Sequence, residues 1–159
     1  MPKPSAALLE LIDLRMQRDR ERTPLYPDAY RIKPKYDTAT ANGLTKAIID
    51  YIDLKGGWAT RISVEGRMIK TSTRSSGVFG SNKTDQYKRI PSSVKRGTAD
   101  IHAVYLGRHI SIEVKIGADR QSDEQKEIEQ LINDAGGHYF IARTFEAFHE
   151  FINTIQPCY

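Results

Sequence analysis

The sequence predicts an α/β fold, in which a mixed sheet is flanked by helices. Stretches with helical spacing of apolar residues alternate with shorter stretches in which apolar residues recur at every second position. The chain has 159 residues, of which 39% are hydrophobic and 28% charged, values that are typical of soluble globular proteins. That length suffices for one buried core and not for two ordinary domains. We therefore expect one domain with appendages.

Four segments show helical spacing with stop signals at their ends. The first ends before Pro24 and Pro27, which forbid its continuation, and the second ends at Gly56-Gly57. The third closes at another glycine pair, Gly136-Gly137. The predicted helices cover residues 5–22, 40–55, 123–135 and 144–155. The apolar face of the first helix packs either on its own domain or on a second copy of the chain.

Four other segments show the pattern of strands, at residues 58–64, 99–106, 109–115 and 138–143. The second and third are joined by Gly107-Arg108, which is short enough for a two-residue hairpin turn. From Gly66 to Gly97 small polar residues and lysine dominate, so this segment is either a strand returning after Glu65-Gly66 or a long loop. We expect a helix with a linker at residues 1–38 and a domain at residues 39–159. Within that domain, residues 66–97 form a basic, flexible segment.

Three features of the sequence favour a cytoplasmic protein. No apolar run approaches the roughly 18 to 20 residues that are needed to cross a bilayer. Glu10 and Asp13 interrupt the N-terminal apolar stretch, so it lacks the apolar core of a secretory signal. The single cysteine, Cys158, has no partner for an internal disulfide, which indicates a reducing compartment.

The net charge of +4 is unevenly distributed along the chain. Nine basic and two acidic residues lie between Arg61 and Arg96, a local balance of 9 − 2 = +7, so the rest of the chain carries 4 − 7 = −3. Such a segment is either a surface for the phosphate backbone of a nucleic acid or a solvated loop. On the first interpretation it orders on binding and contacts the DNA backbone, without base readout, through Arg61, Arg67, Arg74, Lys88, Arg89, Lys95 and Arg96.

Hairpin geometry gathers charged residues on one face of the two middle strands. With Gly107-Arg108 as the turn, Asp100 pairs with Lys115 and His102 pairs with Glu113. One face is then apolar and belongs to the core: Ile101, Ala103, Tyr105, Ile110, Ile112 and Val114. The other face carries Asp100, His102, Ser111, Glu113 and Lys115. Buried charges are costly unless they are compensated, so this face is either a site for a divalent cation such as Mg²⁺ or a structural salt-bridge cluster.

The order of these residues resembles a known nuclease pattern. Gly97-Thr98-Ala99-Asp100, a gap of twelve residues, Glu113-Val114-Lys115, and then Ser122-x-x-Gln125 at a helix start are similar to the PD-(D/E)XK nuclease superfamily, in particular its VRR-NUC branch. The resemblance covers about residues 40 to 152. It implies a restriction-endonuclease-like sheet and a Mg²⁺- or Mn²⁺-dependent DNA endonuclease that acts on branched or flapped DNA, such as a Holliday junction, and a homodimer that makes two cuts.

The resemblance also assigns roles to individual residues. It implies that Asp100, Glu113 and the Val114 carbonyl bind the metal, that Lys115 is the catalytic lysine, and that Gln125 supports it. Gln125 also fits a capping box that begins at Ser122, and both roles are compatible.

The first core helix departs from the family pattern, in which a glutamate points at the metal. The equivalent position here is Asn42, which either binds the metal or metal-bound water without supplying charge, or acts as a plain N-cap. Another acid, such as Glu65, is the remaining candidate for that place.

Two further classes of function remain as alternatives. One is a DNA-binding module that keeps the fold without catalysis, and the other is a restriction-type endonuclease. His102 either contacts the substrate or is a structural histidine, and the remaining histidines show no spacing of a zinc site. The sequence has no P-loop, so we expect cleavage that does not depend on nucleotide hydrolysis by this chain.

Overall fold

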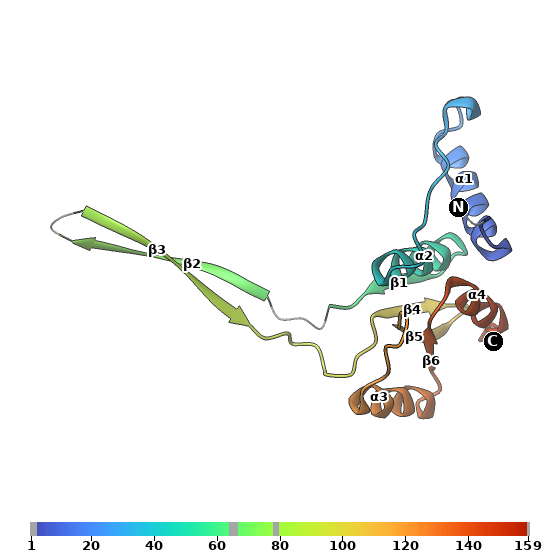
Figure 1. Ribbon diagram of the computed structural model, residues 1–159. Coiled ribbons are helices and arrows are strands. Elements are labelled where there is room, and N and C mark those ends of the chain that lie inside the picture. Colours follow the sequence, from blue (N-terminus) through green and yellow to red (C-terminus); the bar gives the residue numbers. More distant parts are fainter. Residues whose placement is uncertain (1–2, 64–66, 78–79, 159) are drawn as a thin grey trace. The chain divides into compact units, whose positions relative to one another are not determined.

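A computed structural model describes residues 3–63, 67–77 and 80–158, and the chain divides into two compact units. The first unit consists of residues 1–62 and 97–159, and the second of Ser63–Arg96. Figure 1 labels the elements of both units. The units are described one at a time below.

The first unit holds four α-helices, a short 3-10 helix and a four-stranded sheet among its described residues (Figure 1). The helices are α1 (Ala6–Arg22), η1 (Asp28–Tyr30), α2 (Ala41–Leu54), α3 (Asp123–Asp134) and α4 (Phe145–Thr154). The strands are β1 (Trp58–Arg61), β4 (Ile101–Tyr105), β5 (Arg108–Val114) and β6 (His138–Ala142). They lie in the order β1-β4-β5-β6, with β5 and β6 parallel and the other neighbours antiparallel. The predicted mixed α/β architecture is confirmed.

The helix starts follow from local hydrogen bonds that the sequence encodes. The hydroxyl groups of Thr40, Ser122 and Thr144 each accept a backbone N–H three residues further on, at the starts of α2, α3 and α4. The predicted Asn42 N-cap is wrong, because the cap is Thr40, whose hydroxyl accepts the Gly43 N–H at 3.2 Å. No helix within the described ranges is both long enough and apolar enough to span a membrane.

The turn between β4 and β5 differs from the predicted one. Tyr105 pairs with Arg108, so the turn residues are Leu106 and Gly107, and both have positive φ (51° and 76°) as a type I′ turn requires. The Cys158 N–H donates to the Leu106 carbonyl at 3.0 Å, a contact from the far end of the chain that local sequence does not reveal. His102 consequently lies opposite Ser111 rather than Glu113. A shift of two residues keeps every side chain on its predicted face.

The apolar face of the hairpin forms the core, as predicted. Ile101, Ile110 and Ile112 have no exposed surface, and they pack in one cluster with residues of α2 and α4. In that cluster the ring of Tyr51 meets those of Phe145 and Phe148 edge to face, each at 5.9 Å between centroids.

The first helix packs on its own unit. Leu11 of α1 is fully buried in the core cluster. Nearby, the carboxylate of Glu10 accepts the Tyr51 hydroxyl at 3.0 Å and contacts His149 at 2.6 Å. The intramolecular alternative for α1 is therefore confirmed by apolar and polar contacts to α2 and α4.

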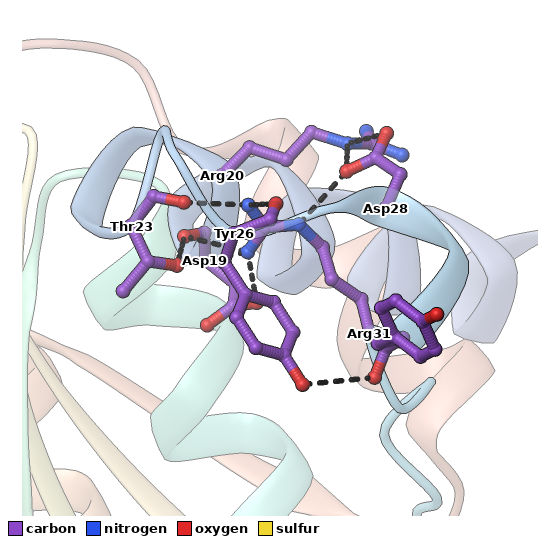
Figure 2. A network of polar contacts seen from close by, with 7 residues as sticks. Asp19, Arg20, Thr23, Tyr26, Asp28 and Arg31 are labelled. Atoms are coloured by element: carbon purple, nitrogen blue, oxygen red, sulfur yellow. Dashed lines mark hydrogen bonds and ion pairs between the residues drawn. The ribbon is translucent and has the colours of Figure 1, made fainter.

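The segment after α1 is held by one arginine (Figure 2). The Arg31 side chain is only 1% exposed and donates to the Asp19 carboxylate at 2.6 Å and the Asp28 carboxylate at 2.8 Å. It also donates to the carbonyls of Thr23 and Tyr26 at 2.6 and 2.7 Å. These contacts fold residues 23–31 back onto the end of α1, so the predicted linker begins with an ordered turn.

The second unit contains a single two-stranded hairpin in its described part. Its strands are β2 (Arg67–Gly77) and β3 (Gly80–Ile90), paired in register from Arg67 opposite Ile90 to Gly77 opposite Gly80. This segment is therefore not the predicted long loop. It is also not a strand that returns to pair with β1, because β1 pairs with β4 and β2 pairs with β3. The predicted turn at residues 65–66 lies outside the described residues. The strands were missed because their polar residues show no alternation.

Candidate functional site

The polar face of β5 is buried as deeply as its apolar face. Ser111, Glu113 and Lys115 are 0%, 3% and 8% exposed, although they alternate with the core residues of β5. Both faces of β5 are therefore covered. A buried carboxylate and a buried lysine require partners, because removing an ion from water is costly.

Asp100 is held next to this pair by main-chain contacts. Its Oδ2 accepts the Val114 N–H at 3.0 Å, and its own carbonyl accepts the Ile62 N–H at 2.7 Å. The N–H and carbonyl of one strand residue point to the same edge, so the Val114 carbonyl is expected on the β4 side of β5. The structure thus brings together Asp100, Glu113, Val114 and Lys115, four of the predicted site residues, and their roles stay predictions.

Glu113 occupies the centre of the cluster and is only partly satisfied. Its Oε1 accepts the Gln125 amide at 2.5 Å and the Lys115 ammonium at 3.1 Å. Its Oε2 is buried and has no hydrogen-bond partner within the described residues. Burial, and then the charge of Asp100, raise the pKa of Glu113, against the opposing effects of Lys115 and Gln125. Burial and the charge of Asp100 together thus disfavour the ionised form of Glu113.

Lys115 is a buried cation with two acidic partners. Its Nζ lies 3.1 Å from Glu113 Oε1 and 3.3 Å from Asp119 Oδ2. Burial lowers its pKa, but the hydrogen bonds and charges of Glu113 and Asp119 outweigh burial and raise the pKa above its ordinary value. Lys115 is thus protonated at neutral pH, which suits it to stabilise negative charge and not to act as a base.

Sequence reasoning missed Asp119. Its loop is fixed by Arg143, which donates to the carbonyls of Gly117 and Asp119 at 3.3 and 3.1 Å. The only local signal was an acid four residues after Lys115 in a segment without strand or helix pattern. Such spacing is common, so it did not identify the residue.

Gln125 forms the predicted capping box, and its side chain contacts Glu113 rather than Lys115, so its supporting role stays a prediction. At the start of α3 the Ser122 hydroxyl accepts the Gln125 N–H at 3.3 Å, and the Gln125 side-chain oxygen accepts the Ser122 N–H at 3.0 Å. The side-chain amide nitrogen of Gln125 is thus available to donate to Glu113, at 2.5 Å. Gly97 allows the segment before Asp100 to approach α3, because it has a φ of +80° and a Cβ there would lie 2.4 Å from the Glu124 carbonyl oxygen.

Asn42 contacts a different group from the one predicted. Its side-chain oxygen accepts a hydrogen bond from the Arg61 guanidinium at 2.9 Å, so the structure engages it with a cation and not with the carboxylates. Arg61, a predicted DNA contact on β1, is exposed. Glu65, the alternative acid, lies outside the described residues.

The other predicted DNA contacts lie in the second unit. Lys88 and Arg89 are exposed on β3, and Lys95 and Arg96 are exposed in the segment that follows it. The side chains of Arg67 and Arg74, on β2, lie outside the described set.

A row of polar groups continues the buried face away from the carboxylates. His102 on β4, Ser111 on β5 and Tyr139 on β6 are register neighbours. The His102 Nε2, the Ser111 hydroxyl and the Tyr139 hydroxyl are buried without hydrogen-bond partners in the described part of the chain. The amide of Gln121, which also lowers the pKa of Tyr139, donates to Glu129 at 2.7 Å.

The pKa values of His102 and Tyr139, the two aromatic residues of this row, are shifted in directions that favour the neutral forms. Burial, and then the charge of nearby His109, lower the pKa of His102. Burial, and then the charge of Glu113, raise the pKa of Tyr139. The row is therefore neutral at physiological pH, and the charge on this face is confined to the carboxylate end.

The carboxylate end fits a hard divalent cation. No group of three or more His, Cys, Asp or Glu side chains suited to a metal occurs among the described residues, and the donors that the resemblance implies are two carboxylates and one backbone carbonyl. Mg²⁺ is typically bound by one or two carboxylates, waters and substrate phosphates. The partnerless Glu113 oxygen and the adverse charge of Asp100 both favour a cation there. Zinc, which prefers nitrogen and sulfur ligands, fits less well.

Comparison with protein-family models and with curated proteins gave no match to this chain.

Proposed function

We propose that this chain is a Mg²⁺- or Mn²⁺-dependent DNA endonuclease with a VRR-NUC-like site on a restriction-endonuclease-like sheet. One observation carries the proposal: Glu113 is buried with a partnerless oxygen, next to Asp100 and to the protonated amine of Lys115. A purely structural salt-bridge cluster would also satisfy the second oxygen of Glu113, whereas here only Oε1 has partners, Lys115 and Gln125. The cytoplasmic setting and a homodimer remain parts of this proposal.

The contacts of each residue support the chemistry that we propose for it. Asp100, Glu113 and the Val114 carbonyl would hold the metal, which supplies activation of a water molecule and neutralisation of phosphate charge. Lys115 stabilises the negative charge that develops on the phosphoryl oxygens. Gln125 fixes the orientation of the Glu113 carboxylate through its 2.5 Å hydrogen bond, and Asp119 keeps Lys115 charged.

DNA is the proposed substrate because of the second unit. Its residues Ser63–Arg96 include eight basic and two acidic residues, a balance of 8 − 2 = +6. A surface of that charge attracts a phosphate backbone and releases counterions on binding. Branched or flapped DNA is proposed on the resemblance of the motif, and a symmetric dimer would make two cuts at a four-way junction.

Cleavage assays test this function directly. The protein is incubated with linear, flapped and four-way-junction DNA in Mg²⁺ or Mn²⁺, and wild type is compared with Asp100→Ala. We expect the variant to lose at least about 100-fold in rate, as for removal of an electrostatic group at a reacting phosphate. Asp123→Ala is the matched control, because Asp123 is an exposed acid whose partner is Lys126, at 2.8 Å. Cleavage by Asp100→Ala at the wild-type rate would end the active-site proposal.

A non-catalytic DNA-binding module is the second candidate. The pairing of Asn42 with Arg61 favours it, because the first core helix then contributes no ligand to the site. In that case both proteins bind DNA and neither cleaves it. A restriction-type enzyme, in contrast, would cut linear duplex at a defined sequence.

A further inference from the structure

The β2–β3 hairpin presents side chains on one open face. Strand pairing places Met68 opposite Arg89 and Lys70 opposite Tyr87, and alternation puts these four residues on the same side. We call this set the ribbon face. Met68 and Tyr87 are 62% and 63% exposed, and Lys70 is paired with Asp85 of the same face at 2.6 Å.

The opposite side of the hairpin has neighbours within its own unit. Ile69 and Ile90 share that side and line a pocket together with Pro91 and Val94. The pocket also includes Ser92, whose hydroxyl donates to the Ser63 carbonyl at 3.5 Å. The chain that follows β3 therefore lies against part of this side, where Ile69 and Ile90 are 42% and 45% exposed, and the ribbon face is the more open of the two sides.

An isolated two-stranded hairpin is only marginally stable in water, so exposed apolar side chains on it indicate a partner. The unit's charge of +6 selects a polyanion as that partner. It opposes pairing with a second copy of the same hairpin, since like charges would meet. A membrane surface would favour apolar residues clustered without interleaved cations, whereas here Arg89 lies directly opposite Met68.

We propose that the hairpin lies in the major groove of duplex DNA with the ribbon face toward the base edges. This rests on DNA being the substrate, as proposed above. The major groove is about 12 Å wide and admits a two-stranded ribbon. Strands of eleven residues span roughly 36 Å at about 3.3 Å per residue, close to one turn of B-DNA. The substrate therefore contains a duplex arm of at least one helical turn.

The residues of the ribbon face suit base edges as well as phosphates. An arginine such as Arg89 donates to the O6 and N7 acceptors of guanine, and apolar groups such as Met68 and the ring of Tyr87 contact the methyl group of thymine. Base contacts of this kind go beyond the backbone binding predicted from charge alone. They give the enzyme a modest sequence preference on the duplex arm.

Methylation of guanine N7 by dimethyl sulfate tests the groove directly. The full chain, held inactive in EDTA or Ca²⁺, is bound to a flapped DNA whose duplex arm contains several guanines. We expect N7 protection over about one helical turn by wild type. The double variant Tyr87→Ala and Arg89→Ala loses that protection and binds at least about 10-fold more weakly. Both positions are exposed, so circular dichroism and thermal unfolding should be unchanged.

Lys88→Ala is the matched control, because Lys88 is an adjacent exposed cation on the opposite side. It should weaken binding evenly across sequences and keep N7 protection. Bound wild type that leaves N7 unprotected would overturn the proposal, as would stronger binding to anionic lipid vesicles than to duplex DNA. If N7 is unprotected while Asp100-dependent cleavage persists, the groove proposal alone fails. If N7 is protected without any cleavage, the nuclease proposal fails and the groove proposal stands.

Discussion

The two faces of strand β5 are equally buried and chemically opposite. Ile112 is fully buried against the core and Glu113, the next residue, is 3% exposed on the other side. The apolar face removes hydrocarbon from water, which stabilises the fold. The polar face buries a carboxylate with an unpaired oxygen, which lowers stability. Burial alone therefore does not identify a core, and the residues that are buried at a cost point to the site.

The largest expected effect on stability comes from the apolar face. Ile112→Ala removes hydrocarbon from a fully buried position, so the free energy of unfolding should fall by about 2 to 5 kcal/mol. Urea denaturation measures this change. Leu131→Ala is the control, because Leu131 is 55% exposed and its loss should change stability by less than about 0.5 kcal/mol. Equal effects at both positions would contradict the assignment of the core.

On the polar face, Glu113→Gln should not lower the free energy of unfolding at neutral pH, in contrast to Ile112→Ala. In EDTA the raised pKa of Glu113 means that the folded state favours the neutral carboxyl, with burial as the main cause. The contribution of Glu113 is thus fully present below its ordinary pKa and is lost as pH rises through the folded-state pKa. At neutral pH the variant should be at least as stable as wild type, while DNA cleavage is lost.

Unfolding curves recorded from acidic to neutral pH, with and without the substitution, measure this difference. The stability advantage of Glu113→Gln should grow as pH rises. Glu127→Gln, at an exposed position of α3, should show no such trend. A variant that is destabilised at neutral pH and unaffected in acid would show that Glu113 is a structural ion-pair residue.

The smallest effects are expected in the polar row. The hydroxyl groups of Tyr139 and Ser111 have no hydrogen-bond partner within the described residues, so Tyr139→Phe and Ser111→Ala should leave unfolding unchanged or raise its free energy by up to about 1 kcal/mol. Tyr51→Phe is the matched control. The Tyr51 hydroxyl donates to Glu10 at 3.0 Å, and its loss should cost about 1 to 2 kcal/mol. Thermal unfolding of the three variants would show whether the unpartnered hydroxyls matter.

Local signals predicted most of the fold of the first unit. The Ser122 capping box and the alternation of β4 and β5 depend on neighbouring residues, so the start of α3 and the two faces of the hairpin were predicted correctly, whereas the Asn42 cap was not. The hairpin turn was placed one residue late, because Leu106 adopts its positive φ where the chain end, at Cys158, contacts it. The β2–β3 hairpin was missed because its small polar residues show no alternation with apolar ones.

The candidate site was predicted in part, for the same reason. Asp100, Glu113, Lys115 and Gln125 are linked by strand pairing and a helix cap, both of which leave a mark in the sequence. Tyr139 reaches the polar face through the parallel pairing of β5 with β6, and a parallel pair is joined by a crossover that short-range patterns do not fix. Asn42 was assigned to the metal site by its position in the family pattern. Its contact with Arg61 depends instead on β1, the strand that follows α2.

Binding of a divalent cation at Glu113 is the central claim, and thermal unfolding tests it most directly. Wild type, Glu113→Gln and Asp100→Asn are each unfolded at neutral pH in EDTA and in excess Mg²⁺. A ligand that binds only the folded state raises the unfolding temperature, and tighter binding raises it more. We predict that Mg²⁺ raises that temperature for wild type and leaves both variants unchanged. An equal rise in all three proteins, or none in wild type even with uncleaved DNA present, would contradict the account.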